Sequence, residues 1–417
     1  MTTPNKVSII GGGIQGLCTA YYLNKQGLEV SIFEPKTAET GASYVNAGYL
    51  TPSHIIPLAA PGMIRKGLKW MLNSSSPFYV KPRIDKAFIK WSWRFYKSST
   101  LQKVNAAIPV IKEINLLSEQ CFKEIKLSGD LGDFQLDHHG LLMLYKTKAA
   151  GEAENEVAKK AANLGLQVSY PNQIELNSLQ PQLSKDILGG ILYDCDSHTT
   201  PTEIMPKLKK KLLDSGVKFI TEKVCRFELQ NNKLTAIVTD KNNYPTEEVV
   251  IAAGAWSGQL AKQLNIDLSL EAGKGYRIDV KRETGIKIPA ILMEAKVAVT
   301  PMKGFTRFAG TMELSGINTN IRRERVNAIV KAAEAYYPGL KITAAEKEAA
   351  ASGMRPVSPD GLPYIGRSKA LKNLCFATGH AMMGWSLGPA TGKLVSEIIL
   401  NKKPSMDLAP FNPDRKF

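Results

Sequence analysis

Near its N-terminus the chain reads Val7-Ser-Ile-Ile-Gly-Gly-Gly-Ile-Gln-Gly-Leu17. The first four residues predict a short buried strand, and the glycines that follow have the G-x-G-x-x-G spacing at Gly11, Gly13 and Gly16. In such a motif the first glycine allows a tight turn, the second lets a pyrophosphate approach the backbone, and the third lets the next helix pack closely on the sheet. The stretch therefore predicts a dinucleotide held at a helix N-terminus.

The residues after the glycines provide the rest of a Rossmann unit. An apolar face beginning at Leu17 predicts a helix that stops at Gly27, and Glu29–Glu34 predicts a second strand ending in an acid. Glu34 lies 18 residues beyond Gly16, where a carboxylate meets the ribose hydroxyls. A negative charge there disfavours a 2′-phosphate, so we expect FAD or NAD rather than NADP. A glycine-rich turn in an unrelated βα unit is the disfavoured alternative.

Length and composition indicate a globular protein with more than one domain. At about 150 residues per domain, 417 residues predict two or more domains. The five cysteines are scattered, odd in number and without a C-x-x-C pair, which argues against a disulfide framework or a zinc site and suits a reducing compartment. The adjacent His138 and His139 would face opposite ways on a strand, so no metal site is expected. With no apolar run of about 18 residues and no leader, we expect a cytoplasmic protein.

The net charge of +16 has one local concentration. Ten basic residues and only one acid, Asp85, lie between Gly62 and Lys103, interleaved with Trp, Met and Phe at helical spacing. This pattern suggests a surface that contacts anionic lipid at the inner face of the cell membrane, as in a peripheral membrane protein. The alternative is a solvated helical excursion whose aromatic side chains belong to the core. Nucleic acid is not expected as a partner, because the chain has no recognisable binding module.

A second glycine turn follows a later apolar segment of the chain. The apolar run that starts at Glu248 ends in Ala253-Gly254, as does a parallel-sheet strand whose carboxyl end abuts a cofactor. Two further segments share this glycine-rich character: Thr40-Gly-Ala-Ser43, followed by Asn46-Ala-Gly48, and the run from Gly379 to Gly392. The second of these segments opens a final helix that continues to Leu400.

With these segments and Gly353–Gly366, which contains Arg-Pro, Pro-Asp-Gly and Ile-Gly, the chain resembles the FAD-dependent D-amino acid dehydrogenases. These form part of the D-amino acid oxidase and glycine oxidase superfamily, and the resemblance spans nearly the whole chain. It implies an α/β protein: a Rossmann-like FAD-binding domain and a second, α+β substrate domain built on an antiparallel sheet. We expect the FAD-binding domain to be discontinuous, drawing on residues 1–52, 196–262 and 345–417. Residues 53–195 and 263–344 would form the substrate domain.

The motif and the resemblance together predict the residues that bind FAD. They are Gly11, Gly13, Ile14, Gln15, Gly16, Glu34, Ser43, Asn46, Ala47, Gly48, Val224, Ala253, Gly254, Gly379, Gly384, Trp385 and Ser386. Related sarcosine oxidases tether the flavin through a cysteine near the start of the Arg-Pro signature. This chain has Gly353 there, so non-covalent FAD is expected.

The resemblance also implies the reaction and its substrate contacts. The α-carbon would lose a hydride to flavin N5, and water would hydrolyse the resulting imine to a 2-oxo acid and ammonia. Arg355 falls where glycine oxidases carry an arginine, and its planar fork suits a substrate carboxylate; the alternative is a structural salt bridge or cap. Tyr276 is a second predicted contact, and Arg307 is a weaker candidate. His380 would contact flavin or substrate, unless the backbone satisfies it. No side chain is assigned as an acid, base or nucleophile.

The sequence is compatible with several functions. The leading one is oxidation of D-amino acids with electrons passed to a quinone or another acceptor. A near rival is an oxidase or dehydrogenase of glycine, sarcosine or a cyclic imino acid such as hydroxy-D-proline. An NAD-dependent dehydrogenase and a non-catalytic flavin-binding scaffold are more distant alternatives.

Overall fold

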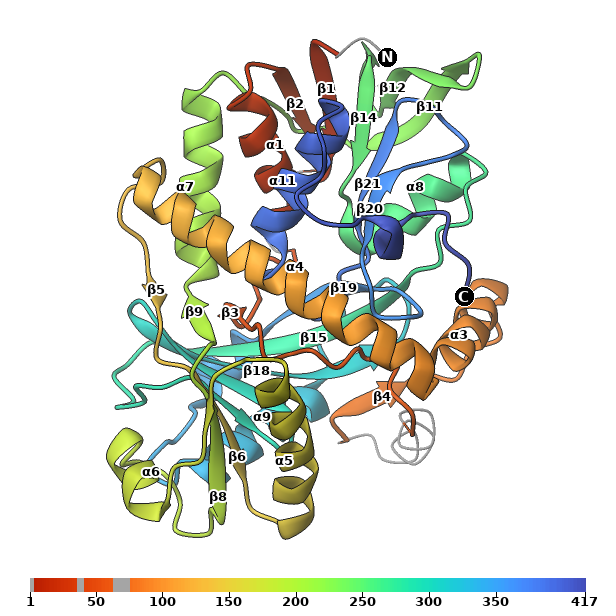
Figure 1. Ribbon diagram of the computed structural model, residues 1–417. Coiled ribbons are helices and arrows are strands. Elements are labelled where there is room, and N and C mark those ends of the chain that lie inside the picture. Colours follow the sequence, from red (N-terminus) through yellow and green to blue (C-terminus); the bar gives the residue numbers. More distant parts are fainter. Residues whose placement is uncertain (1–3, 36–40, 63–75) are drawn as a thin grey trace.

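The computed structural model describes residues 4–35, 41–62 and 76–417. Its upper part in Figure 1 is built on a six-stranded sheet. Five strands run parallel, and the last edge strand runs antiparallel to its neighbour. In spatial order they are β10 (Lys218–Ile220), β2 (Glu29–Phe33), β1 (Lys6–Ile10), β14 (Glu248–Ile251), β21 (Leu374–Thr378) and β20 (Tyr364–Arg367).

Helices cover one face of this sheet and a small sheet covers the other. The helices are α1 (Ile14–Asn24), α7 (Pro201–Asp214), α11 (Gly388–Ile399) and the long α4 (Leu101–Ser128), which share one apolar core. The opposite face packs against β11 (Val224–Gln230), β12 (Lys233–Thr239), β13 (Asn243–Pro245) and α8 (Ser257–Gln263). Because both faces are covered, β1 is buried at every position after Lys6. The predicted Rossmann-like unit is confirmed.

The lower part of Figure 1 is built on a nine-stranded sheet. Most of its pairings are antiparallel, as predicted, but two strand pairs, β16–β6 and β18–β4, are parallel. Its strands are β19 (Ala351–Val357), β15 (Glu271–Val280), β18 (Phe305–Leu314), β17 (Val297–Met302), β16 (Ala290–Leu292), β6 (Leu141–Tyr145), β8 (Gly189–Tyr193) and β7 (Val168–Ser169), with β4 (Phe78–Val80) alongside β18.

The two faces of β15 have different neighbours. Tyr276, Ile278 and Val280 pack into a core with α9 (Arg323–Tyr336). Gly273 and Gly275 lie on the opposite face, because side-chain directions alternate along a strand. Gly353 of β19 pairs with Gly275, and a Cβ on Gly353 would lie 2.3 Å from Val45. This glycine-lined face is therefore the one that meets the loop at residues 41–48.

The remaining elements connect these two sheets. A small sheet joins β3 (Tyr49–Leu50), β9 (Ser197–Thr199) and β5 (Leu136–Asp137). The other helices are α3 (Lys86–Ser98), α5 (Lys148–Asn163), α6 (Gln173–Leu179) and α10 (Ala344–Glu348), with 3₁₀ turns at Gly254–Trp256 and Ala409–Phe411. Within the described ranges no helix combines the length and the apolar character that crossing a membrane requires.

Two elements bear on the predicted domain boundaries. All strands of the six-stranded sheet come from the predicted FAD-binding domain. β19, however, pairs with β15 in the nine-stranded sheet although it falls within residues 345–417. Conversely, α4 packs against α11 although it falls within residues 53–195. The exact division between the two domains stays a prediction.

Candidate active site

Two glycine turns meet where the central parallel strands end. Gly11 has φ +113°, and a Cβ there would lie 2.5 Å from the carbonyl oxygen of Ala252, just after β14. A Cβ on Gly16 would lie 1.9 Å from the carbonyl oxygen of Gly11, so α1 can approach β1 this closely only with glycine at that position. The turn after β14 contains Ala253 and Gly254. The turns at the carboxyl ends of β1 and β14 therefore pack closely against each other.

The N-terminus of α1 lies directly after the first of these turns. Gly13 is its N-cap and supplies no side-chain cap. The Ile14 N–H donates instead to the Ser43 hydroxyl at 3.0 Å, and a Cβ on Gly13 would lie 3.3 Å from that same oxygen. Ser43, predicted to bind the cofactor, therefore lies at the positive end of α1, where an anion is stabilised.

The N-terminus of α11 lies beside that of α1 (Figure 1). Cβ atoms on Gly388 and Gly392 would lie 2.6 Å from Ile14 Cγ1 and 2.4 Å from the carbonyl carbon of Cys18, so glycines allow the two helices to touch. α11 has no side-chain cap either. The site therefore has two neighbouring helix ends of positive dipole.

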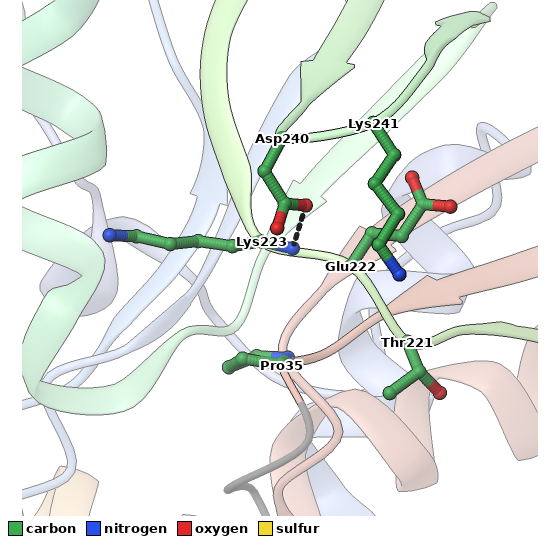
Figure 2. Close-up of a pocket in the computed structure, with 6 residues that line it drawn as sticks. All are labelled: Pro35, Thr221, Glu222, Lys223, Asp240 and Lys241. Atoms are coloured by element: carbon green, nitrogen blue, oxygen red, sulfur yellow. Dashed lines mark hydrogen bonds between the residues drawn. The ribbon is translucent and has the colours of Figure 1, made fainter.

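The predicted ribose end lies on the other side of the glycine turn. A Cβ on Gly12 would lie 1.9 Å from Glu34 Oε2, so the carboxylate lies directly over the glycines. Its Oε1 accepts a hydrogen bond from Lys209 Nζ at 2.8 Å. Figure 2 shows the residues around a hollow beside this end, among them Lys223, which precedes the predicted Val224 in sequence, and the dashed line marks the bond from the Lys223 N–H to Asp240. The hollow is lined by Pro35, Thr221, Glu222, Lys223, Asp240 and Lys241.

Two buried polar atoms near the helix ends have no hydrogen-bond partner within residues 4–35, 41–62 and 76–417. Gln15 donates from Nε2 to the Gly384 carbonyl at 2.6 Å, which leaves its Oε1 unpaired. His380 shares a 2.9 Å hydrogen bond between Nε2 and the Thr391 hydroxyl, while its Nδ1 is unpaired. Unpaired buried polar atoms are rare in folded proteins. Together with the glycine cradle and the uncapped helix ends, they fit a bound dinucleotide.

His380 is neutral at any working pH. Burial lowers the pKa of its imidazole to about 3. It lies on the turn after β21, which begins at Gly379 (φ +82°). A Cβ on Gly379 would lie 2.7 Å from the Tyr364 ring, so this turn also needs glycine. A contact from His380 to flavin or substrate would be that of an uncharged imidazole.

The loop at residues 41–48 is held from the nine-stranded sheet by Arg307. This fully buried guanidinium pairs with Asp279 through Nε at 2.8 Å and Nη2 at 2.9 Å, and Nη1 donates to the carbonyls of Tyr44 and Asn46. Arg307 was a weak candidate for a substrate contact. Its hydrogen bonds show a different role, because the fork is occupied by the protein itself. Thr40, quoted with this loop, lies outside the described residues.

Further along the same loop the backbone is fixed at three points. Gly48 donates its N–H to the Asn46 side chain at 2.8 Å, and Thr300 donates to the Ala47 carbonyl at 2.8 Å. Gly48 has φ +78°, and a Cβ there would lie 2.2 Å from the Thr199 carbonyl oxygen. The predicted flavin segment is therefore rigidly supported.

Trp385 and Ser386 point their side chains into the protein. The Trp385 indole donates to Thr199 Oγ1 at 2.8 Å. The Ser386 hydroxyl donates to Asn115 of α4 at 2.8 Å and accepts from the Thr51 N–H. Any contact that these two residues make with a cofactor is left to their backbone.

Arg355 lies on the glycine-lined face of the nine-stranded sheet. A Cβ on Gly275 would lie 2.1 Å from its Nη1, so the guanidinium lies flat over that glycine. Its one hydrogen bond goes to the Thr311 carbonyl at 3.3 Å, and no carboxylate of the described residues pairs with it. Burial lowers the pKa of Arg355 to about 10, which leaves it charged at neutral pH. A half-buried cation without an acid partner among the described residues is suited to bind an anionic ligand.

Tyr276 does not share that face. It is buried among the side chains beneath α9, and its hydroxyl donates to Glu313 at 2.8 Å. Strand alternation directs Tyr276 away from Arg355, so the structure does not bring these two predicted substrate contacts together. Sequence reasoning also missed Thr311 and Asn115, because neither belongs to a recognisable motif.

Comparison with known proteins agrees with this geometry. The sequence profile of the family described as FAD dependent oxidoreductase (DAO) matches residues 6–398. The chain is 28% identical to a D-amino acid dehydrogenase of Helicobacter pylori over 94% of each chain. It is also 28% identical to a D-amino acid dehydrogenase of Allorhizobium ampelinum over 97% of each chain.

Solved structures share the fold at lower identity. A glycine oxidase from Geobacillus kaustophilus superposes with a TM-score of 0.79 at 21% identity, covering 99% of this chain and all of the other. An L-proline dehydrogenase from P. horikoshii superposes with a TM-score of 0.75 at 17% identity, covering 99% of this chain and 98% of the other.

Proposed function

The chain belongs to the FAD dependent oxidoreductase family, and from this premise we propose that it oxidises D-amino acids to 2-oxo acids and ammonia. The observation that carries the proposal is Arg355, a half-buried cation that lies over Gly275 and has no acid partner among the described residues. A substrate carboxylate is the partner that its planar fork binds with two oxygens. The names of the relatives support an amino acid of D configuration.

The chain's own residues provide positioning rather than acid–base chemistry. When bound, FAD supplies the acceptor for the hydride that leaves the substrate α-carbon. Arg355 would fix the carboxylate, and the lack of a side chain on Gly275 leaves room for the guanidinium to lie against the sheet. His380, held neutral, adds no charge that would compete with Arg355. Water then hydrolyses the imine to the 2-oxo acid and ammonia.

Product analysis tests this proposal against its rival. With an artificial dye as acceptor, D-amino acids should release ammonia and 2-oxo acid in equal amounts, with kcat/KM well above that for glycine, sarcosine or hydroxy-D-proline. Preferred turnover of one of these three would support the oxidase or imino-acid alternative, whose fold relatives include a glycine oxidase. No turnover of any amine would support a non-catalytic flavoprotein.

We further propose that electrons pass to a quinone in the membrane. Helix α3 supports this proposal, because its inner side packs near the Arg355 strand and its outer side is exposed to solvent. On its inner side Trp91 is buried and donates Nε1 to the Val357 carbonyl at 2.9 Å. Trp91 packs in one apolar cluster with Val357, which ends the Arg355 strand β19, and with Met312 of β18. This helix therefore covers the substrate side of the molecule.

The outer side of α3 is aromatic and basic. Ile89, Trp93 and Tyr96 follow one another along a single stripe and are 55%, 57% and 59% exposed. Exposed lysines flank that stripe: Lys86, Lys90 and Lys97. Exposed aromatic residues beside lysines suit the interface of an anionic bilayer. Part of the predicted basic segment, residues 63–75, lies outside the described residues.

The double variant Trp93→Ala/Tyr96→Ala tests this surface. Wild-type protein should sediment with vesicles of anionic phospholipid and reduce a quinone within them, with little peroxide formed. The double variant should bind vesicles about tenfold more weakly, because two interfacial anchors are lost, while turnover with a soluble dye stays unchanged. Ile174→Ala/Leu188→Ala, which removes exposed apolar residues elsewhere, is the matched control. Stoichiometric peroxide, or no vesicle binding by wild-type protein, would contradict the quinone proposal.

A further inference from the structure

Thr311 adopts a backbone conformation that β-branched residues avoid. Its φ is +61°, in the left-handed region. It lies in a β-bulge of β18: Gly310 pairs with Tyr276 and Glu313 pairs with Lys274, so Thr311 and Met312 together lie opposite the single residue Gly275. Bulges of this kind re-aim groups beside active sites.

The bulge turns Thr311 toward Arg355. The Thr311 carbonyl accepts the one hydrogen bond that Arg355 makes, from Nη1 at 3.3 Å. Gly275, opposite the bulge, is the residue over which the guanidinium lies. The bulge, the glycine and the cation therefore form one arrangement on the face that meets the loop at residues 41–48.

A buried network behind the sheet fixes the bulge in place. Glu313 accepts from the Tyr276 hydroxyl at 2.8 Å and pairs with Lys274 Nζ at 3.2 Å. On the other strand edge, the Met312 N–H donates to the Pro77 carbonyl at 2.8 Å. An unfavourable φ persists only where its surroundings over-determine it, and such positions cluster at functional sites.

The Thr311 hydroxyl is left without a partner among the described residues. Thr311 is 7% exposed, and its Oγ1 is buried with no hydrogen bond. We propose that this hydroxyl accepts an N–H of the substrate amino group while Arg355 holds the carboxylate; this rests on the proposed function. An α-amino acid carries both groups on one carbon, so the amine acceptor must belong to a residue near the guanidinium, and the carbonyl oxygen of Thr311 lies 3.3 Å from Arg355 Nη1. Accepting an N–H leaves the nitrogen lone pair free to form the imine.

A pair of ligands with the same carbon skeleton isolates the amino group. D-alanine carries both groups, and propionate carries the carboxylate alone. Thr311→Val keeps the β-branched shape, and so the same backbone preference, but removes the hydroxyl; Thr311→Ser keeps the hydroxyl. Reduction kinetics would be measured with D-alanine, and propionate affinity by perturbation of the flavin spectrum, on purified holoenzyme of each form.

Thr311→Val should raise KM for D-alanine about tenfold, the usual effect of one lost hydrogen bond, with propionate affinity unchanged and Thr311→Ser close to wild type. If Thr311→Val weakens the binding of D-alanine and of propionate equally, Thr311 has a structural role alone and the proposal is overturned. Wild-type KM in Thr311→Val would overturn it as well. A wild-type protein that neither binds nor oxidises D-alanine would overturn both this inference and the proposed function, whereas an active wild type with an unaffected valine variant would overturn this inference alone.

Discussion

Replacement of Arg355 by methionine is expected to lower kcat/KM for a D-amino acid by roughly 30-fold to several thousand-fold, since removing one partner of a charge pair that the bound substrate buries costs about 2–5 kcal/mol. The loss should appear as weaker substrate binding, because the guanidinium contacts the carboxylate in both ground and transition states. Arg355→Lys should recover only part of the activity, because an ammonium keeps the charge but not the fork. The flavin spectrum should be unchanged. Steady-state kinetics with the dye acceptor would measure these effects.

The same variant should leave the fold at least as stable. Arg355 is a half-buried cation with one hydrogen bond, of 3.3 Å, among the described residues, so an apolar side chain should leave the free energy of unfolding unchanged or raise it by about 1 kcal/mol. Arg282→Met, which removes a more exposed arginine paired with Glu346, is the control and should keep full activity. Lower stability of Arg355→Met with normal kinetics would instead identify Arg355 as a structural ion-pair or capping residue.

Gly13→Ala is expected to weaken FAD binding by roughly 100-fold or more, because the second glycine of the motif is where backbone and pyrophosphate approach each other. The protein without cofactor should tolerate the change: Gly13 has φ −75°, and the new Cβ would meet only Ser43 Oγ, at 3.3 Å. Equilibrium titration of the apoprotein with FAD would measure the affinity, and thermal unfolding would measure the stability.

Two other glycines calibrate that result. Gly16→Ala would place a Cβ 1.9 Å from a backbone oxygen, so it should damage the fold as well as cofactor binding. Gly339→Ala has nothing within 4 Å of the new Cβ and should change neither. Acid precipitation of wild-type protein should release all the flavin to the supernatant, as non-covalent binding requires. Normal FAD affinity in Gly13→Ala would contradict the assignment of the pyrophosphate site.

Local patterns were sufficient to predict the cofactor half of the fold. The strand–glycine–helix sequence at Val7–Leu17 became β1 and α1, and the acidic strand end brought Glu34 over the glycines. These features depend on residues close together in sequence, whose spacing fixes their geometry. The run ending in Ala253-Gly254 was similarly informative, since β14 lies directly beside β1.

The substrate half depends on contacts between distant segments, which no local pattern encodes. Alternation along β15 indicates that Gly275 and Tyr276 face opposite ways, but only the packing of α9 decides which face is buried away from the site. Arg307 matched an expected substrate cation by residue type alone. Its pairing with Asp279, 28 positions earlier, and with the loop carbonyls follows from the register of β15 and β18.

The bulge at Thr311 could not be predicted from the sequence, for a different reason. Threonine favours extended strands, and nothing in Gly310-Thr311-Met312-Glu313 signals a positive φ at its second residue. The conformation arises where β18 exchanges its neighbour β17 for β4, because β17 pairing ends at Gly310 and β4 pairing begins at Met312.

The proposed oxidation of D-amino acids is tested most directly by reducing the bound flavin with D- and L-amino acids in the absence of oxygen. Purified protein should carry a flavin absorption spectrum that D-amino acids bleach, with one equivalent of 2-oxo acid formed per flavin. The matching L-amino acids and the 2-hydroxy acids of the same skeleton should leave the spectrum oxidised. Bleaching by L-amino acids or 2-hydroxy acids, but not by D-amino acids, would contradict the proposed function. A purified protein that has no flavin bands and cannot be loaded with FAD would contradict it as well.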